Sequence, residues 1–379
     1  MTLAPPPAFI TDAERLERLT RLRAAMETAG VTGLLLGSTD NLRYFTGLVW
    51  HGSERLLGAL VTAQDLVYIV PGFEESKVET LQRLPGRTAL WQEEESPAAL
   101  VARLLGGQGL LAIDDAMPLF FYHALASVLS PERLVNAGPL MRPLRRIKSQ
   151  AEIDILHYAM GLTLEVHKRA HAILTPGIRA SDVVRFIDEQ HRALAGHAST
   201  FCIVSFGQAT ALPHGAEGEQ VLEKGDVILV DTGTRIDGYH SDLTRTYVLD
   251  GPDADFAAHF AIERAAQQAV FDAARLGAPM QALDAAARAV LAEKGLGPDY
   301  RLPGLPHRAG HGIGLEIHEE PYVVRGNETL LEPGMCFSNE PMIVFPGRYG
   351  IRLEDHIYMT EAGPAWFTPP QESPIEPFA

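Results

Sequence analysis

The chain has 379 residues, 46% hydrophobic and 21% charged, a length typical of two domains and a composition that excludes a disordered or fibrous protein. Its formal net charge of −16 argues against binding to nucleic acid or to an anionic membrane, because both partners require a basic surface. Two distant cysteines and apolar runs no longer than a strand exclude a disulfide framework, a thiolate zinc site and a membrane span, and we expect a soluble, cytoplasmic protein.

The first part of the chain alternates between predicted helices and strands. Hydrophobic periodicity, with glycine as a stop signal, predicts a helix over residues 11–29 and strands over residues 31–36, 56–62, 66–70 and 110–113. The two middle strands form a hairpin across a short polar turn. This alternation predicts an α/β domain over residues 1–145.

A second domain is expected over residues 146–379. Ser149 and Glu152 fit a capping box, in which each side chain satisfies a backbone N–H group at the start of a helix. Helices are predicted over residues 149–174, 181–195, 254–276 and 280–294, with strands after each pair. Two helices followed by a hairpin, occurring twice, predict an α+β domain built from two pseudo-symmetric halves.

The first predicted hairpin of this domain carries two aspartates. Asp231 and Asp242 lie equally far from a point between Ile236 and Asp237, beside the turn signal Asp237-Gly238. We therefore expect the two carboxylates to face each other with Cβ atoms about 5 Å apart. Asp231 also ends an apolar strand and should be buried. Two such carboxylates repel each other unless a cation neutralises them.

The second predicted hairpin repeats the arrangement with glutamates. Glu340 and Glu354 lie equally far from Gly347, on predicted strands over residues 335–340 and 350–359. One acid in a hairpin is commonly a solvated charge, but two matched pairs in two repeated units indicate a site.

Histidine completes the predicted ligand set. His311 lies on a glycine-rich turn, and His214 and His318 lie near the two hairpins. Two aspartates, two glutamates and one histidine form a sulfur-free set that suits Mn²⁺, Co²⁺, Fe²⁺ or Zn²⁺. Four carboxylates balance the charge of two divalent ions, so the pattern predicts a dinuclear site.

Four strings around these residues resemble the pita-bread metallopeptidases, which include methionine aminopeptidase, Xaa-Pro aminopeptidase and Xaa-Pro dipeptidase (prolidase). The strings are ALPHG, GYHSDLTRT, HGIGLEIHE and GIRLED, at residues 211–215, 238–246, 311–319 and 350–355. The string NLRYFTG at residues 41–47 resembles the creatinase/prolidase N-terminal domain, which favours the proline-directed branch. The resemblance implies an α/β N-terminal domain of that type, followed by a pseudo-symmetric pita-bread catalytic domain.

The resemblance also implies roles for individual residues. Two divalent ions, manganese first and cobalt, zinc or iron as alternatives, would be held by Asp231, Asp242, His311, Glu340 and Glu354. The residues implied in catalysis are His214, His318 and Glu340, and His307 would line the substrate pocket.

Further substrate-contacting residues are expected around this centre. Arg352 lies on the same strand face as Glu354 and is either a clamp for the terminal carboxylate of a dipeptide or an ion-pair partner of the ligands. Tyr239 is either a pocket wall or part of the core. Trp50, His51 and Arg55 lie on a glycine-flanked loop, which in the resembling prolidases closes the active site of the other subunit of a homodimer.

One position departs from the family pattern. Val344 stands where the family carries a tyrosine whose hydroxyl lies near the reaction centre. A minority bacterial subgroup of Xaa-Pro dipeptidases shares this departure, which leaves one hydrogen-bond donor fewer and, we expect, a roomier wall.

The sequence therefore predicts a dinuclear metallopeptidase that cleaves the Xaa-Pro bond in dipeptides. The alternatives are an Xaa-Pro aminopeptidase acting on longer peptides, a hydrolase of a small non-peptide amide, and a non-catalytic peptide-binding module. The partners expected are small proline-containing peptides and a second copy of the chain.

Overall fold

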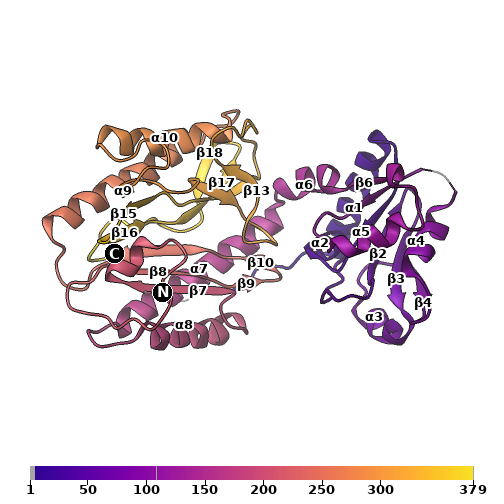
Figure 1. The fold of residues 1–379 in the computed structure, drawn as a ribbon, viewed down its shortest axis with the longest axis horizontal. Helices are drawn as coiled ribbons and strands as arrows, with labels where there is room; N and C mark the ends of the chain where they lie inside the picture. Colours follow the sequence, from indigo (N-terminus) through magenta and orange to yellow (C-terminus); the bar gives the residue numbers. More distant parts are fainter. Residues whose placement is uncertain (1–4, 108, 379) are drawn as a thin grey trace. The chain divides into compact units, whose positions relative to one another are not determined.

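The computed structural model describes residues 5–107 and 109–378, which form two compact units (Figure 1). The first unit is Ile10–Arg145, and the second runs from Arg146 onwards together with residues 5–9. Within the described residues, no helix is long and apolar enough to cross a membrane.

The first unit is built on a six-stranded sheet with the order β4-β3-β2-β1-β5-β6. Neighbours β1–β2 and β2–β3 are antiparallel, and the other three pairs are parallel. The strands are β1 Val31–Leu36, β2 Gly58–Thr62, β3 Leu66–Pro71, β4 Arg87–Trp91, β5 Leu110–Ile113 and β6 Leu134–Asn136. The helices are α1 Asp12–Thr28, α2 Asp40–Thr46, α3 Glu75–Leu81, α4 Pro97–Leu105, α5 Leu119–Ala126 and α6 Gly138–Arg146.

Local sequence signals explain much of this unit. The predicted first helix is confirmed as α1, whose N-cap Thr11 accepts a hydrogen bond from the N–H of Glu14. The predicted hairpin is confirmed as β2–β3, in which Val61 pairs with Leu66. Side chains of the central strands, such as Leu35 and Leu60, are fully buried in one core with those of α4 and α5.

The second unit repeats a plan of two long helices followed by strands. Its helices are α7 Gln150–Ile173, α8 Ala180–Ala195, α9 Ala254–Ala273 and α10 Met280–Glu293. The strands of the first half are β7 Phe201–Phe206, β8 Ile228–Gly233, β9 Arg235–Ile236, β10 Tyr239–His240 and β11 Leu243–Tyr247. Those of the second half are β12 Gly310–Gly312, β13 Glu319–Val323, β14 Cys336–Asn339, β15 Met342–Phe345, β16 Tyr349–Arg352, β17 Asp355–Thr360 and β18 Gly363–Trp366.

Each half has its own sheet and its own core. The first half holds the sheet β11-β8-β7, and its core joins α7 and α8 to β7 and β8. The second half holds the sheet β13-β12-β14-β17-β18, and α9 and α10 pack on a core with these strands (Figure 1). The predicted capping box is confirmed at the start of α7, where Ser149 and Glu152 each bond the backbone N–H of the other.

The predicted register of the first hairpin is wrong by two residues. Asp231 pairs with Thr244, not with Asp242. The reason is the turn: Asp237 and Gly238 both have left-handed φ values, 45° and 85°, so the two-residue turn is centred between them. The turn centre expected from the sequence lies one residue earlier, and an error of one residue in the centre becomes an error of two in the pairing across the hairpin.

The predicted register of the second hairpin is confirmed, although the predicted strand over residues 350–359 is in fact two, β16 and β17, and β14 is followed by an unpredicted strand, β15. Met342 pairs with Arg352 in β15–β16, and Asn339 pairs with Asp355 in β14–β17, both symmetric about Gly347. The two pairs belong to different sheets. Glu340 and Glu354 lie at the break between the two sheets, one in the segment from β14 to β15 and the other in the segment from β16 to β17.

Candidate metal centre

The five predicted ligands lie in or directly beside five different strands of the second unit. Asp231 lies in β8, and His311 lies in β12. Asp242 and Glu354 directly precede β11 and β17, and Glu340 directly follows β14. An isolated bridge between Thr244 and Glu354 joins the strands of the two halves, and the Glu354 N–H donates to the Thr244 carbonyl at 3.2 Å. This bridge brings the acids of both hairpins to one place.

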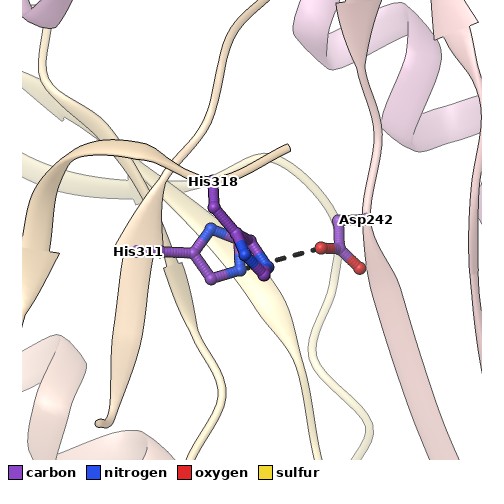
Figure 2. Close-up of side chains that lie close together, drawn as sticks. All are labelled: Asp242, His311 and His318. Carbon is purple, nitrogen blue, oxygen red and sulfur yellow. Dashed lines mark ion pairs between the residues drawn. The ribbon is translucent and has the colours of Figure 1, made fainter. Parts of the chain in front are cut away.

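The imidazole of His311 is the centre of this cluster. Its Nε2 atom lies 3.2 Å from Glu340 Oε1, 3.7 Å from Asp242 Oδ2 and 3.9 Å from Glu354 Oε1. Figure 2 shows His311 and His318 side by side, both directed toward Asp242. The ligand atoms of His311, Glu340 and Glu354 lie within 4.8 Å of one another, as do those of Asp242, His311 and His318.

Burial and mutual repulsion perturb the acids of the cluster. The pKa of Glu340 is raised to about 7, first by burial and then by the charge of Asp231. The pKa values of Asp242 and Glu354 are raised well above the usual range, by burial and by the neighbouring carboxylates. Burial also lowers the pKa of His311 far below its usual value, so its ring is neutral. A neutral imidazole among crowded carboxylates is a donor set for cations.

Asp231 points to Arg352 in this structure. The Arg352 Nη2 atom donates to Asp231 Oδ2, while Nε donates to Thr244 Oγ1 at 3.0 Å and Nη1 to the Pro213 carbonyl at 3.0 Å. Every guanidinium nitrogen thus has a protein acceptor. This geometry corresponds to the ion-pair alternative for Arg352, with a ligand carboxylate as its partner.

Unpartnered oxygens test whether the residues present fit metal ions. Asp231 Oδ1, Asp242 Oδ1 and Glu354 Oε1 are buried and have no hydrogen-bond partner among the described residues. Leaving a buried carboxylate oxygen unpaired is costly unless a cation or water satisfies it. Asp242 and Glu354 both lie within 4 Å of the neutral His311, and their unpartnered oxygens fit the binding of divalent cations. Asp231 lies outside the candidate groups of metal-binding residues among the described residues.

Three further histidines surround the cluster. The ring centroid of His318 lies 4.0 Å from that of His311, and His318 is exposed. His214 is exposed, and its charge disfavours protonation of both His307 and His318, which places it near them. His307 is partly buried, its Nδ1 bonds the Arg308 carbonyl at 2.6 Å, and burial lowers its pKa to about 4. The structure therefore brings the predicted catalytic and pocket histidines together.

Two predicted features belong to the core instead. Tyr239 is 2% exposed and donates its hydroxyl hydrogen bond to Glu152 Oε1 at 2.9 Å, which corresponds to the core alternative rather than a pocket wall. Val344 is 3% exposed and lies in the core of the second half. Whether this valine leaves a roomier pocket wall than a tyrosine would stays a prediction.

The N-terminal substrate residues Trp50, His51 and Arg55 lie between α2 and β2 of the first unit. The Lys77 ammonium lies 4.4 Å from the centroid of the Trp50 ring, and Arg55 bonds Glu93 at 2.9 Å. His51 is exposed. These contacts tie the loop to its own unit.

Sequence reasoning missed three residues that touch the cluster or its strands. Thr244 donates to Glu354 Oε2 at 2.7 Å, and the Gln267 amide donates to the carbonyls of Asn339 and Leu353, which precede the two ligand glutamates. A ring nitrogen of His356 lies within 4.8 Å of ligand atoms of Asp242 and Glu354. Strand alternation could have indicated Thr244 and His356, which follow ligands by two residues, whereas Gln267 carries no local signal.

Family models and related sequences match both units of the chain. The model of metallopeptidase family M24 matches residues 154–361, and that of the creatinase/prolidase N-terminal domain matches residues 18–147. The probable dipeptidase PepE of Mycobacterium tuberculosis is 39% identical over 351 residues, covering 91% of this chain and 92% of that protein.

Two solved structures resemble the whole chain. Dipeptidase PepE from Mycobacterium ulcerans superposes with a TM-score of 0.89 at 37% identity, covering 96% of this chain and 97% of the other. Xaa-Pro dipeptidase from Bacillus anthracis gives 0.83 at 30% identity, covering 94% and 98%. The predicted fold, a creatinase-type N-terminal domain followed by a pita-bread catalytic domain, is confirmed. The chain belongs to metallopeptidase family M24 and is a peptidase of that family.

Proposed function

We propose that this protein is a dinuclear metal-dependent dipeptidase that hydrolyses the Xaa-Pro bond. The observation that carries the proposal is the convergence of Asp242, Glu340 and Glu354 on the Nε2 atom of His311, with buried oxygens left unpartnered. Asp231, the fifth ligand, would join them through its unpartnered Oδ1 atom, while Oδ2 keeps its contact with Arg352. Manganese is the first candidate for the ion, because the set is rich in hard oxygen donors.

When bound, a pair of divalent ions supplies Lewis acidity and lowers the pKa of a coordinated water molecule. The residues of the chain provide the remaining functions. Glu340, whose Oε1 atom lies 3.2 Å from His311 Nε2 within the cluster, can take a proton at its carboxylate from the attacking water and return it to the leaving nitrogen. His318 and His214, both exposed beside the buried cluster, can donate hydrogen bonds to the substrate carbonyl, and His307 can line the pocket.

The choice of an Xaa-Pro dipeptide is supported by the names of related proteins. One solved structure that resembles the chain is an Xaa-Pro dipeptidase, and the more similar PepE proteins are named dipeptidases without reference to proline. The proposal therefore has two separate parts: that the substrate is a dipeptide, and that its second residue is proline.

A substrate panel tests both parts. The manganese-loaded enzyme should cleave Ala-Pro faster than Ala-Ala, and faster than it releases alanine from Ala-Pro-Ala. Faster cleavage of Ala-Ala would contradict the proline requirement. Faster cleavage of the tripeptide would identify an Xaa-Pro aminopeptidase. Binding of Ala-Pro without turnover would identify a peptide-binding module.

The contacts of Arg352 predict how its loss affects substrates. We expect Arg352→Gln to lower turnover of Ala-Pro and of Ala-Pro-amide by the same factor, because the guanidinium supports Asp231 rather than the substrate carboxylate. Leaving one partner of a buried ion pair alone costs about 3–5 kcal/mol, so the metal-free variant should also melt earlier. Kinetics on both substrates measure the effect. A loss confined to the free dipeptide would instead identify a carboxylate clamp.

We further propose that the active form is a homodimer in which Trp50, His51 and Arg55 limit substrate length. Aromatic and arginine side chains on a loop are typical of binding surfaces. Light scattering should give about twice the 41.3 kDa of the chain. Trp50→Ala should improve cleavage of Ala-Pro-Ala relative to Ala-Pro. A monomer with full activity and unchanged preference would contradict the proposal.

A further inference from the structure

His356 is a buried histidine beside the metal centre that the expected ligand set does not use. It is the second residue of β17 and follows Glu354 by two positions, so strand alternation places both side chains on the same face. Its side chain is fully buried, at 0% exposure. The Asp242 backbone lies close enough to the ring to act as a weak hydrogen-bond partner, but neither ring nitrogen makes a hydrogen bond of ordinary geometry within the described part of the chain. One backbone acceptor satisfies at most one ring nitrogen, so at least one buried nitrogen requires a partner besides it.

The surroundings of His356 indicate what that partner is. One ring nitrogen, together with carboxylate oxygens of Asp242 and Glu354, forms a group whose atoms all lie within 4.8 Å of one another. Ligands of one divalent ion, each about 2.1 Å from it, lie up to about 4.2 Å apart, so only a small adjustment would close this group on an ion. An ion bound by Asp242 and Glu354 could therefore take a nitrogen ligand from His356 as well as from His311.

His311 and His356 approach the same two carboxylates as separate imidazole groups. The rings of His311 and His356 have centroids 6.0 Å apart, and the His356 nitrogens make no hydrogen bond to His311. His311 Nε2 lies within 4 Å of oxygens of Asp242 and Glu354, and His356 forms its own group with the same two residues. Two carboxylates shared between two separate imidazoles form a framework for two ions, each with one nitrogen donor.

We propose that His356 is a metal ligand, binding through a ring nitrogen the ion that His311 does not bind and sharing Asp242 and Glu354 with it. The inference rests on the proposed metal-dependent function and extends its ligand set from one histidine to two. The competing partner for the ring nitrogens is an ordered water molecule, which buried polar groups commonly bind.

X-ray absorption on the zinc-loaded protein separates these two cases, because imidazole rings give a distinct outer-shell scattering pattern. One histidine averaged over two ions contributes about half an imidazole per metal. His356→Phe, which keeps an aromatic ring of similar size but no donor, should therefore lower the average count by that amount. His171→Phe is the matched control, since His171 packs its ring against Tyr247 at 5.0 Å, away from the ligands, and should leave the count unchanged.

Metal affinity provides the second readout. Competition with a chelator should show that His356→Phe binds the more weakly held ion about 10- to 100-fold less tightly, the loss typical even of groups that only support a ligand. His356→Asp restores a donor atom and should recover affinity without recovering the imidazole signal. Should His356→Phe not fold, the imidazole count of the wild-type protein, compared with His311→Asp, still decides the question.

The outcomes separate this inference from the proposed function. A wild-type protein that binds no metal would overturn both. Two ions in the wild type, with an imidazole count and affinities unchanged in His356→Phe, would overturn the ligand role and assign the ring nitrogens to water. A lower count together with a weakened second ion supports the proposal.

Discussion

Replacing Asp242 by asparagine is expected to reduce peptidase activity by at least about 10³-fold, equivalent to about 4 kcal/mol of transition-state stabilisation. Asp242 lies within 4 Å of His311 and shares its site with Glu354, so removing its charge removes the carboxylate that both ions would share. Turnover of Ala-Pro at saturating manganese measures the effect, and metal analysis should show loss of at least one ion.

The stability of the Asp242→Asn variant distinguishes a lost ligand from a damaged fold. In the metal-free protein the Asp242 pKa is raised by burial and by three neighbouring carboxylates, so its charge is unfavourable there. The variant should consequently melt no earlier than the wild type in chelator. Asp272→Asn, an identical change at an exposed position of α9, should keep full activity. An inactive Asp242→Asn that melts earlier in chelator would indicate misfolding instead.

Removal of the metal ions should produce the second large effect, and that effect should grow with pH. A site occupied at 100 times its dissociation constant contributes about 2.7 kcal/mol to the free energy of unfolding. At pH 8 we therefore expect chelation to lower the melting temperature by several degrees. Calorimetry of the loaded and the chelated protein over a range of pH measures this difference.

The sign of the pH dependence follows from the raised carboxyl pKa values. In the metal-free native state Asp242, Glu340 and Glu354 bind protons more tightly than in the unfolded chain, so the chelated protein loses stability as pH rises from about 4.5 to the Glu340 pKa of about 7 and beyond. Cations require the deprotonated ligands, so the loaded protein gains stability relative to the chelated one over the same window. The gap between the two melting curves should widen with pH.

Glu263 is a buried carboxyl group outside the candidate metal centre, and it serves as an internal control for this measurement. Glu263 of α9 is fully buried, its two oxygens have no hydrogen-bond partner within residues 5–107 and 109–378, and burial raises its pKa well above the usual value. It is absent from the candidate ligand groups, so its effect on stability should be the same with and without metal and should cancel in the difference. Parallel curves for the loaded and chelated protein would contradict the assignment of the carboxylates as ligands.

The sequence by itself determined the elements with strong local signals and pointed to the candidate ligands. The capping box at Ser149 and the hairpin at residues 58–71 depend on residues close together in the chain, whose hydrogen bonds and periodicity are local. The sequence also predicted that Glu340 and Glu354 are placed symmetrically about Gly347, because the turn between β15 and β16 is centred on that glycine. The spacing of the acids and the glycine-rich turn at His311 therefore predicted one candidate ligand set, of which Asp242, His311, Glu340 and Glu354 lie together in the structure.

Only the tertiary structure decided how these residues meet. The observed register of the first hairpin differs by two residues from the predicted one, because the left-handed conformations of Asp237 and Gly238 fix the centre of its turn. A difference of two residues leaves each side chain on the same face of the sheet, so the hydrophobic pattern could not reveal it. The pairing of Arg352 with Asp231, and the burial of His356 beside Asp242, join residues more than 100 positions apart. Such contacts depend on how the two halves pack at the Thr244–Glu354 bridge, and no local propensity specifies that packing.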